Sequence, residues 1–423
     1  MTEATPPVPA RLIWALGLTQ TVGYGTLYYS FGPLAPHLAR SFGWPEATLF
    51  GVLAGSLLLG GLASPLAGGL ADRFGAARVL ALGSLAACLT LLFCALAGNG
   101  LVFCMALVGL ELAAAFVLYP VAFAALAQAS GAAAQRQIVH VTLIAGFAST
   151  VFWPITTALE QGLGWRGVYL VFAGLNLLVC APIHLFLARH ARRGAVLEGQ
   201  RPVVLGCATP DNARRLLVLM VGGFALSGML SAAVLMHMIP MLEALGLGSA
   251  SVAVATLFGP AQVVSRVTNM GLGARLPQPV LAVIAAGLMP LGVVVLIVSA
   301  PSPIGAGAFA ILFGFGSGLS SIVGGTLPLA LFGNQGYGRR AGLINAGRQV
   351  AAAVAPFVFA LLAAAMGSRM TLAALCAVDM LAVLAFASIA WQTRAAPVHP
   401  LATAAGQVAV RSALRGSSSA ELR

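Results

Sequence analysis

Four acidic or basic residues are candidates for a charge near the centre of a long apolar stretch, and they are the first candidates for chemistry: Glu111, Arg266, Arg348 and Asp379. A charge at the centre of a membrane helix costs about 2.5–3.5 kcal/mol on insertion scales, so it is usually kept for binding, proton transfer or helix pairing. Arg266 precedes Arg275 by about 13 Å of helix, and Arg348 follows Arg340 by about 12 Å. In a bilayer core about 30 Å thick, both guanidinium groups reach middle depths.

Two roles are open for most of these residues. Arg266 and Arg348 either bind an anionic ligand or pair with an acidic side chain such as Glu111. Arg348 lies nearer a loop and is also able to snorkel toward it. Glu111 either relays a proton and balances an arginine, or holds helices together as a buried carboxyl group. For Asp379, in the last apolar stretch, we expect a structural role.

The first apolar stretch carries Gln20, Tyr24 and Tyr28 at spacings i, i+4 and i+8, which places them along one face of a helix. Tyrosine offers a hydroxyl group and an aromatic face, which suit the oxygens and carbon skeleton of a small anion. Tyr28 lies closer to the helix end, where an interfacial or packing role is the alternative. His237 ends a later stretch, where it either titrates near neutrality or is an idle, solvated side chain.

The remaining patterns predict neither an enzyme nor a cofactor. The six cysteines show no CxxC pair and no metal-ligand spacing with histidine, so we interpret them as small apolar residues. The glycine-rich run from Gly314 to Gly325 is no phosphate loop, because it lies at membrane depth and lacks Lys. Such a run favours close helix packing and bending. No Ser/His/Asp set and no carboxylate pair suits an aqueous active site.

The composition excludes a soluble protein. Hydrophobic residues make up 60% of the 423 residues, charged residues only 8%, and the mean hydropathy is +0.98. Soluble domains are about a quarter charged. The formal net charge of +12 does not indicate nucleic-acid binding, because every basic residue is Arg and the arginines are spread between apolar runs. The solvent of this chain is therefore the lipid bilayer.

A membrane span needs about 20 apolar residues. Twelve such spans are expected in an all-α protein, near residues 12–36, 47–70, 78–97, 101–127, 138–160, 167–188, 216–240, 250–270, 279–299, 303–331, 341–366 and 371–391. Residues 1–10 are short and contain no basic residue, so they do not resemble a cleavable signal peptide.

The arginines indicate the orientation. With the N-terminus in the cytoplasm, 17 of the 22 basic residues fall in cytoplasmic segments. Only Arg40, Arg166 and Arg369 fall on the opposite side, while Arg266 and Arg348 lie within spans. The positive-inside rule therefore places both termini in the cytoplasm. We expect a multi-pass protein of the cell membrane, in the bacterial inner membrane.

The chain divides into two halves of six spans at the polar connection Arg189–Arg215. Several landmarks recur at an offset of 203 residues: Arg11 with Arg214, Gly43 with Gly246, Gly68 with Gly271, Arg136 with Arg339, Gly164 with Gly367, and Arg166 with Arg369. Six coincidences at one offset indicate a duplication. We expect a short cytoplasmic segment (1–10), a first bundle (11–188), a cytoplasmic linker (189–213), a second bundle (214–393) and a disordered cytoplasmic tail (394–423). Because six spans return the chain to its starting side, the halves are parallel repeats.

The loop between the second and third spans carries a motif of glycines and charges. Its residues Gly68, Asp72, Arg73, Gly75 and Arg78 match the pattern G-x-x-x-D-[RK]-x-G-x-x-[RK]. This resembles the signature of the major facilitator superfamily, which implies a carrier that works by alternating access and a conformational latch at this loop. The second copy, Gly271–Arg275, has Arg275 where the first has Asp72.

Short motifs in the second half are similar to those of the monocarboxylate-porter and oxalate–formate-antiporter branch. They are residues 237–240 (HMIP) at the end of span seven and residues 259–262 (GPAQ) in span eight, followed by Arg266. The resemblance implies that Arg266 binds a substrate carboxylate, with Arg348 of span eleven as the second cation. The Lys that animal monocarboxylate porters carry in span one is absent, because the chain contains no Lys. Span five also lacks the Gly-Pro pair of drug antiporters.

We therefore expect a secondary transporter of a small organic anion, a mono- or dicarboxylate, that functions as a monomer in the lipid bilayer. A proton or an exchanged anion is the expected coupling partner. An alternative is proton-coupled efflux of a neutral or cationic compound, in which Glu111 is the key residue. A sensor that binds a solute without transporting it is an alternative of another class.

The arginine distribution generates a prediction about topology. A reporter fused after Gly194 should read cytoplasmic, and reporters at Gly98 or Gly162 should read external. Paired alkaline phosphatase and fluorescent-protein fusions measure this. An external signal at Gly194 would overturn the orientation and the span count together.

Overall fold

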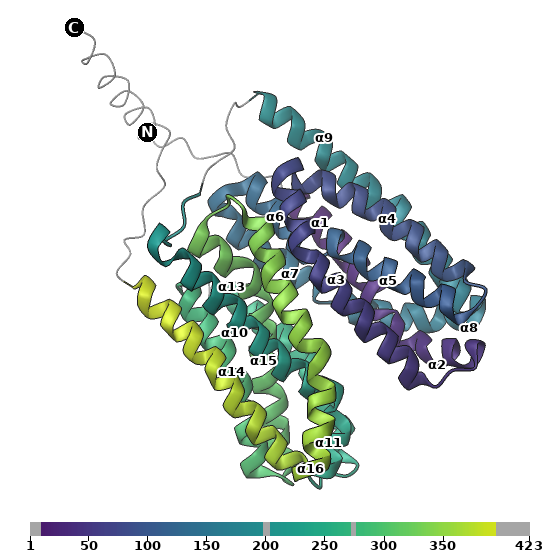
Figure 1. Cartoon of the computed structure of the whole chain (residues 1–423), viewed down its shortest axis with the longest axis vertical. Coiled ribbons are helices and arrows are strands. Elements are labelled where there is room, and N and C mark those ends of the chain that lie inside the picture. The colour runs from purple at the N-terminus through teal and green to yellow at the C-terminus, as the bar shows by residue number, and fades with distance from the viewer. Residues whose placement is uncertain (1–9, 198–203, 272–275, 395–423) are drawn as a thin grey trace.

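The computed structural model describes residues 10–197, 204–271 and 276–394. These residues are almost entirely helical, and the helices form two bundles that lie side by side (Figure 1). Four features that the sequence predicts lie outside the described residues: the N-terminal segment up to residue 9, residues 198–203 of the linker, the loop with Arg275, and the tail from residue 395.

The N-terminal bundle has six spans, and several are broken into shorter helices. Span one is α1 (Ala10–Gly23), the π-helix η1 (Tyr24–Tyr29) and α2 (Phe31–Phe42), and spans two and three are α3 (Glu46–Phe74) and α4 (Ala76–Leu96). Span four is α5 (Gly100–Val117) and α6 (Tyr119–Ser130), with the short turn η2 (Gly131–Ala133) after it. Spans five and six are α7 (Ala134–Ala145), α8 (Ala148–Leu175), the π-helix η3 (Asn176–Cys180) and α9 (Ala181–Leu197).

The C-terminal bundle is built in the same order. Span seven is α10 (Pro210–Met236) with α11 (Met238–Ala244), and span eight is α12 (Ala250–Thr256) with α13 (Phe258–Gly271). Spans nine and ten are α14 (Gln278–Ser299) and α15 (Pro303–Phe332), and α16 (Tyr337–Thr393) contains the last two. Below, the name terminal end is used for one end of the molecule, at which α9 ends and α10 and α16 begin.

Nine helical segments of the described chain are long and apolar enough to cross a membrane. Two of them, of 57 residues each, contain two spans, because the backbone turns at Gly164 (φ 64°) and at Gly367 (φ 78°). The broken first span, residues 10–42, completes the set of twelve. The all-α, twelve-helix architecture in two bundles is thus confirmed.

The 203-residue repeat has a physical counterpart in the backbone. Arg166 Nη2 donates to the carbonyl of Ala97 over 3.0 Å, and Arg369 Nη2 donates to the carbonyl of Ala300 over 3.2 Å. Both donors and both acceptors are separated by 203 residues. The glycines at Gly164 and Gly367 differ by the same offset, and both adopt a positive φ that glycine tolerates without a Cβ clash. The halves therefore share one framework, as the sequence predicted.

At the terminal end the two bundles touch through α3 and α16. The contact is close because its residues are small: a Cβ atom on Gly68 would overlap the carbonyl oxygen of Gly338, and one on Gly342 would overlap that of Ser64. Such close approach of backbones is how membrane helices gain packing energy. Asn345 Nδ2 also donates to Ser64 Oγ over 2.8 Å.

Asp72 caps a helix of the opposite bundle. Its carboxylate accepts hydrogen bonds from the backbone N–H groups of Gly338 and Arg339, both at 2.9 Å. These donors belong to the first turn of α16, where N–H groups lack helical partners and the helix dipole favours an anion. Within its own motif, Gly75 makes the turn after α3 with φ 93°, while Arg73 and Arg78 are exposed.

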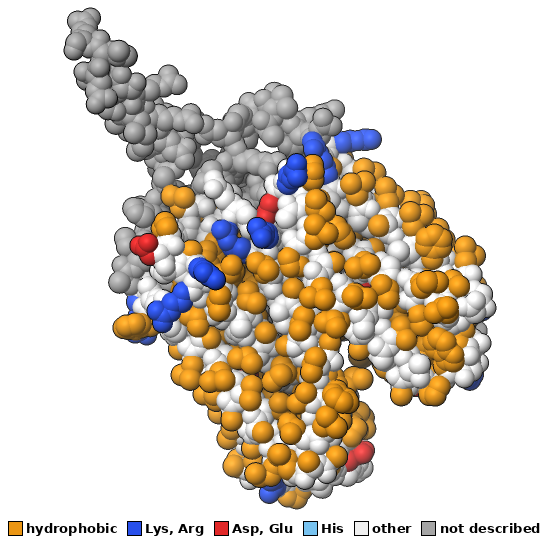
Figure 2. Space-filling view, viewed as in Figure 1, with side chains coloured by type: hydrophobic (Ala, Val, Ile, Leu, Met, Phe, Trp, Pro, Cys, Tyr) orange, Lys and Arg blue, Asp and Glu red, His pale blue; other side chains and the backbone are white. Residues whose placement is uncertain are grey.

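Away from the terminal end the bundles separate. Figure 2 shows a notch between them at the opposite end, and most of the visible arginines gather toward the terminal end. Large apolar side chains cover the outer faces of both bundles; Ile304 and Leu178, for example, are 86% and 75% exposed. The structure is thus closed at the terminal end and open at the other.

We predict that Asp72→Asn weakens this closure. The amide keeps one acceptor but presents a donor to the second N–H, so one charge-assisted bond worth about 1.5–3 kcal/mol is lost. The equilibrium should shift about ten- to a hundredfold toward separated terminal ends, and transport should slow while substrate affinity changes little. Distances between spin labels placed after α2 and after α11 report the shift.

The matched control is Asp211→Asn, which removes an exposed carboxylate in the first turn of α10. It should leave the distances unchanged. Loss of substrate binding in a well-expressed Asp72→Asn protein would contradict a role confined to the closure.

Candidate functional site

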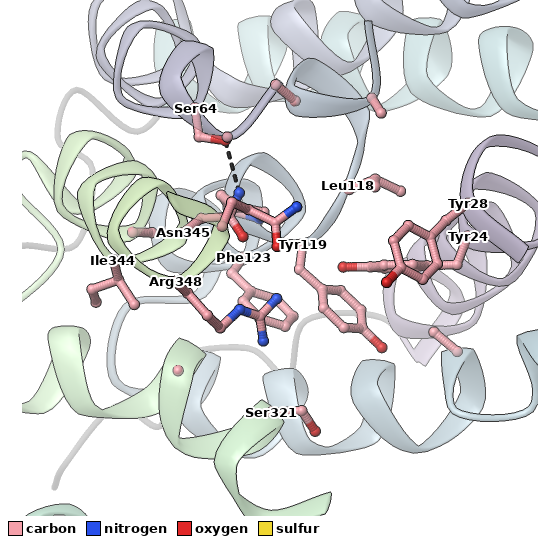
Figure 3. A pocket seen from close by; sticks show the side chains of 18 of the residues that line it. Tyr24, Tyr28, Ser64, Leu118, Tyr119, Phe123, Ser321, Ile344, Asn345 and Arg348 are labelled. Atoms are coloured by element: carbon pink, nitrogen blue, oxygen red, sulfur yellow. Dashed lines mark hydrogen bonds between the residues drawn. The ribbon is translucent and has the colours of Figure 1, made fainter. Parts of the chain in front are cut away.

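A cavity of about 270 Å³ lies between the two bundles. Its walls come from both halves: η1, α3, α5, α6, α7 and α8 on one side, and α10, α13, α15 and α16 on the other. Figure 3 shows side chains of both halves around the same space, with Arg348 and Ile344 from α16 opposite Tyr24 and Tyr28 from η1. Carriers built from two repeats bind their substrates at such a position, between the two bundles.

Arg266 and Arg348 both line this cavity, as the sequence predicted that they could. Neither forms a salt bridge or a protein hydrogen bond within the described residues, where the only ion pair joins His37 and Glu160. Arg266 is only 7% exposed, and its Nε has no partner. Burying a cation without a partner costs free energy. A negatively charged group that entered the cavity would offset this cost.

Glu111 lines the same cavity from α5 and is 4% exposed. Among residues 10–197, 204–271 and 276–394 its Oε1 has no hydrogen-bond partner, and its carboxyl group lies beyond ion-pair distance of both arginines. The sequence left open that Glu111 neutralises Arg266. This conformation contains no such ion pair. The carboxyl group is left free for a proton or a ligand.

The π-helix η1 determines which residues of span one reach the cavity. Its hydrogen bonds run from i to i+5, which widens the turn. As a result Tyr29 joins the predicted Tyr24 and Tyr28 at the cavity wall. Gln20, which the helical spacing placed on the same face, is turned away: its Nε2 donates to the carbonyl of Val117 over 2.7 Å, and the side chain is fully buried.

An aromatic wall covers the N-terminal side of the cavity. It comprises Tyr24, Tyr28, Tyr29, Tyr119 and Phe123. The Tyr24 and Tyr119 rings are 4.6 Å apart, and those of Tyr119 and Phe123 are stacked at 4.8 Å with an interplanar angle of 14°.

Sequence reasoning missed Tyr29, Tyr119 and Phe123. The signal for Tyr119 was available: Pro120 follows it and breaks the run that the sequence suggested as one continuous span. The break between α5 and α6 lies at Leu118, which has an extended backbone (ψ −174°). Because of this break the carbonyl of Val117 lacks its usual helical donor, and it accepts the hydrogen bond from Gln20 Nε2 instead.

Most of the side chains that the C-terminal half contributes to the cavity wall are polar, and the apolar Phe224 and Ile344 lie beside them. Besides the two arginines they include Ser317, Ser320 and Ser321 of α15, with Gln262 of α13. Gln262 Nε2 donates to Ser317 Oγ over 2.8 Å, which joins the two helices. The glycine-rich run in span ten thus does more than permit packing, because its serines contribute to the cavity wall.

Gly146 makes room for Arg266. It lies at the end of α7 in the N-terminal half, and a Cβ atom there would overlap Nη1 of Arg266 from the C-terminal half. The guanidinium group therefore rests against the backbone of the opposite bundle. Its position depends on how the two bundles sit relative to each other.

Two residues considered from the sequence lie elsewhere. Asp379 is fully buried in α16, where its Oδ1 accepts a hydrogen bond from Ser227 Oγ at 3.0 Å. Asn176, 203 residues earlier, is also bonded to a hydroxyl group, but as the donor: its Nδ2 donates to Thr26 Oγ1 over 3.0 Å. A polar contact between spans at both positions favours the structural role expected for Asp379. His237 stacks on Phe359 with ring centroids 4.6 Å apart, outside the cavity wall.

Comparison with known proteins identifies the class. Residues 18–356 match the family model of the Major Facilitator Superfamily, so the chain belongs to this superfamily. It is therefore a multi-pass membrane transporter, and an enzyme is not indicated. No curated protein sequence matches the chain.

Solved structures share the fold at low identity. The human organic anion transporter MFSD10 (TETRAN) superposes with a TM-score of 0.68 at 17% identity, over 90% of this chain and 100% of that one. The proton:xylose symporter XylE, bound to 6-bromo-6-deoxy-D-glucose, gives 0.66 at 14% identity, over 91% and 96%. The transporter FucP in the outward conformation gives 0.65 at 13%, over 92% and 98%. Secondary transport by alternating access follows from family and fold.

We predict that Gly146→Ala displaces the Arg266 guanidinium and thereby weakens binding of the small organic anion that the sequence leads us to expect. The added methyl group occupies the place of Nη1, so the side chain must leave its position. Anion affinity should fall about tenfold, and no further loss should occur when Arg266 is already Gln. Binding measurements on the two single variants and the double variant form the test.

Gly324→Ala is the matched control, because Gly324 lines the same cavity with its nearest neighbouring atom 3.9 Å from a Cβ. It should bind anions like the parent protein. Additive losses in the double variant would contradict the proposed contact.

Proposed function

We propose that the protein transports a small organic anion whose carboxylate binds between Arg266 and Arg348. The observation that carries this proposal is the pair of arginines in the cavity without any acidic partner in the described chain. An arginine–carboxylate pair is charge-assisted and often bidentate, so the ligand supplies what the protein leaves out. Arg266 and Arg348 thus act as anchors, with Tyr24 and Tyr28 as the opposite wall.

The arrangement of the bundles supports a rocking mechanism. The bundles meet at the terminal end through Asp72 and the α3–α16 contact and separate at the other end, from which, in this proposal, the substrate reaches the cavity. With both termini in the cytoplasm, as the arginine distribution indicates, this conformation faces outward. We propose that the carrier acts as a monomer in the bacterial inner membrane and couples the anion to a proton or to a second anion. Both an organic anion transporter and a proton:sugar symporter share the fold, so the charge of the cavity, rather than the fold, favours an anion.

A second candidate function has an observation of its own. Glu111 is buried in the same cavity with an unpartnered oxygen, which suits proton-coupled efflux of a neutral or cationic compound. A solute's charge separates the two candidates: two unpaired arginines repel a cation and attract an anion. A solute-binding sensor of the same fold would bind the anion without moving it.

We predict that Arg266→Gln lowers the affinity for carboxylates about ten- to a hundredfold, because a charge-assisted contact worth about 1.5–3 kcal/mol is lost. Arg266→Lys keeps the charge but not the planar fork, and should restore only part of the affinity. Neutral solutes should be little affected. Counterflow in proteoliposomes across a series of carboxylates, together with the melting temperature of the purified variants, measures both effects.

Arg214→Gln, which removes an exposed arginine at the start of α10, is the control for net charge. A folded Arg266→Gln protein that binds carboxylates as tightly as the parent would end the anion-site proposal. Equal loss for all solutes with a lowered melting temperature would instead assign Arg266 a structural role.

A further inference from the structure

We infer that the transported anion carries an aromatic ring, which lies against the aromatic wall while its carboxylate points toward the two arginines. This inference rests on the proposed function and names the substrate class more closely: small aromatic carboxylates. It follows from the way the two halves divide the chemistry of the cavity.

Five of the six aromatic residues that line the cavity form the aromatic wall, and the sixth, Phe224, comes from α10 of the C-terminal half. Every ring of the aromatic wall comes from the N-terminal half, and both arginines come from the C-terminal half. A ligand that spans the interface therefore meets flat apolar faces on one side and cations on the other. A molecule with an apolar, planar end and an anionic end matches both surfaces.

The geometry of the rings favours an aromatic partner over an aliphatic one. Tyr24, Tyr119 and Phe123 form a run with centroid separations of 4.6 and 4.8 Å, and Tyr28 and Tyr29 meet edge to face at 5.1 Å. These separations lie in the range in which aromatic pairs attract, about 4.5–7 Å. A substrate ring extends an array that is already assembled, whereas an alkyl chain gains only the apolar contact.

The tyrosine hydroxyl groups add a polar rim. Within the described residues, none of the four tyrosine hydroxyl groups of the wall forms a hydrogen bond with the protein. None of these hydroxyl oxygens is among the buried polar atoms that lack a partner. They are therefore open to ring substituents or to water. Figure 3 shows Tyr24 and Tyr119 reaching into the space that Arg348 also enters.

The size of the cavity favours a single ring. Its volume of about 270 Å³ is close to the lower end of small-molecule pockets, about 300–1,000 Å³. A one-ring acid can contact the wall and an arginine at once. Formate and oxalate carry no ring and would leave the aromatic wall unoccupied.

An aromatic wall can also attract cations through their charge, and this is the main competing explanation. Here the same cavity contains two arginines that have no acidic partner in the described part of the chain, and one of them, Arg266, is only 7% exposed. A single carboxyl, Glu111, lies beyond ion-pair distance of both. The charge balance opposes a cation and leaves the aromatic anion as the ligand that satisfies both walls.

The test compares four probes on the purified, full-length protein in proteoliposomes: benzoate, cyclohexanecarboxylate, acetate and benzyl alcohol. We expect benzoate to bind about three- to tenfold more tightly than cyclohexanecarboxylate, which has the same charge and nearly the same size but no π-system. Acetate and benzyl alcohol should each bind much more weakly, since one lacks the ring and the other the charge.

Two variants at one position locate the effect. Tyr119→Phe keeps the ring and should retain the preference for benzoate over cyclohexanecarboxylate, whereas Tyr119→Leu removes the ring and should reduce the ratio toward one. The comparison of probes on the parent protein stands even where a variant fails to fold.

The outcomes separate the two proposals. Equal binding of benzoate and cyclohexanecarboxylate, with both lost in Arg266→Gln, would overturn the aromatic inference and leave the anion function standing. Equal binding of benzoate and benzyl alcohol, or tighter binding of benzylamine, would overturn the anion function itself. A preference for benzoate that persists in Tyr119→Leu would contradict the role of the wall.

Discussion

The rest of this structure depends on one constraint: two guanidinium groups at the centre of a membrane protein that have no acidic partner among the described residues. Each charge at such a depth costs about 2.5–3.5 kcal/mol on insertion scales, so the surroundings must compensate. The serine side chains of α15 make the cavity wall polar, but no acidic side chain of the described residues neutralises either arginine. The irregular backbone follows the same logic: the π-turn at Tyr24–Tyr29 and the break at Leu118 occur where the chain lines this cavity, which is where a bilayer tolerates them.

The duplication supplies a symmetric frame, and the site departs from it. Arg166 and Arg369 make matching hydrogen bonds at the same loop of each half. The charges of the cavity have no such counterparts: 203 residues before Arg266 the chain has Ala63, and before Arg348 it has Ala145. The frame of the two halves is therefore symmetric, as the proposed rocking movement requires. The cavity is not symmetric, because its arginines lie in one half and its aromatic wall in the other.

The fold could be predicted because it follows from the composition of the chain and from the spacing of its apolar and charged residues. Apolar runs of span length, the arginine distribution and the repeat predict twelve helices in two bundles. The site was predictable only in part. A period of 3.6 residues placed Gln20 beside Tyr24, but local backbone geometry decided otherwise: the break at Leu118 exposed a carbonyl that Gln20 satisfies. Likewise, Tyr29 reaches the cavity through a π-turn, which leaves no mark in an α-helical pattern. Such features depend on contacts between spans, which no single span encodes.

The central claim is that the anion lies across the interface between the halves, with its charge on Arg266 and Arg348. The most direct measurement is a crystal structure of the protein with bound 4-bromobenzoate, in which anomalous scattering locates the bromine atom. The account predicts a bromine peak against the aromatic wall near Tyr119 and the carboxylate within hydrogen-bond distance of at least one of the two guanidinium groups. A bromine atom on the arginine side with the carboxylate turned toward the tyrosines, or a ligand bound outside this cavity, would contradict it.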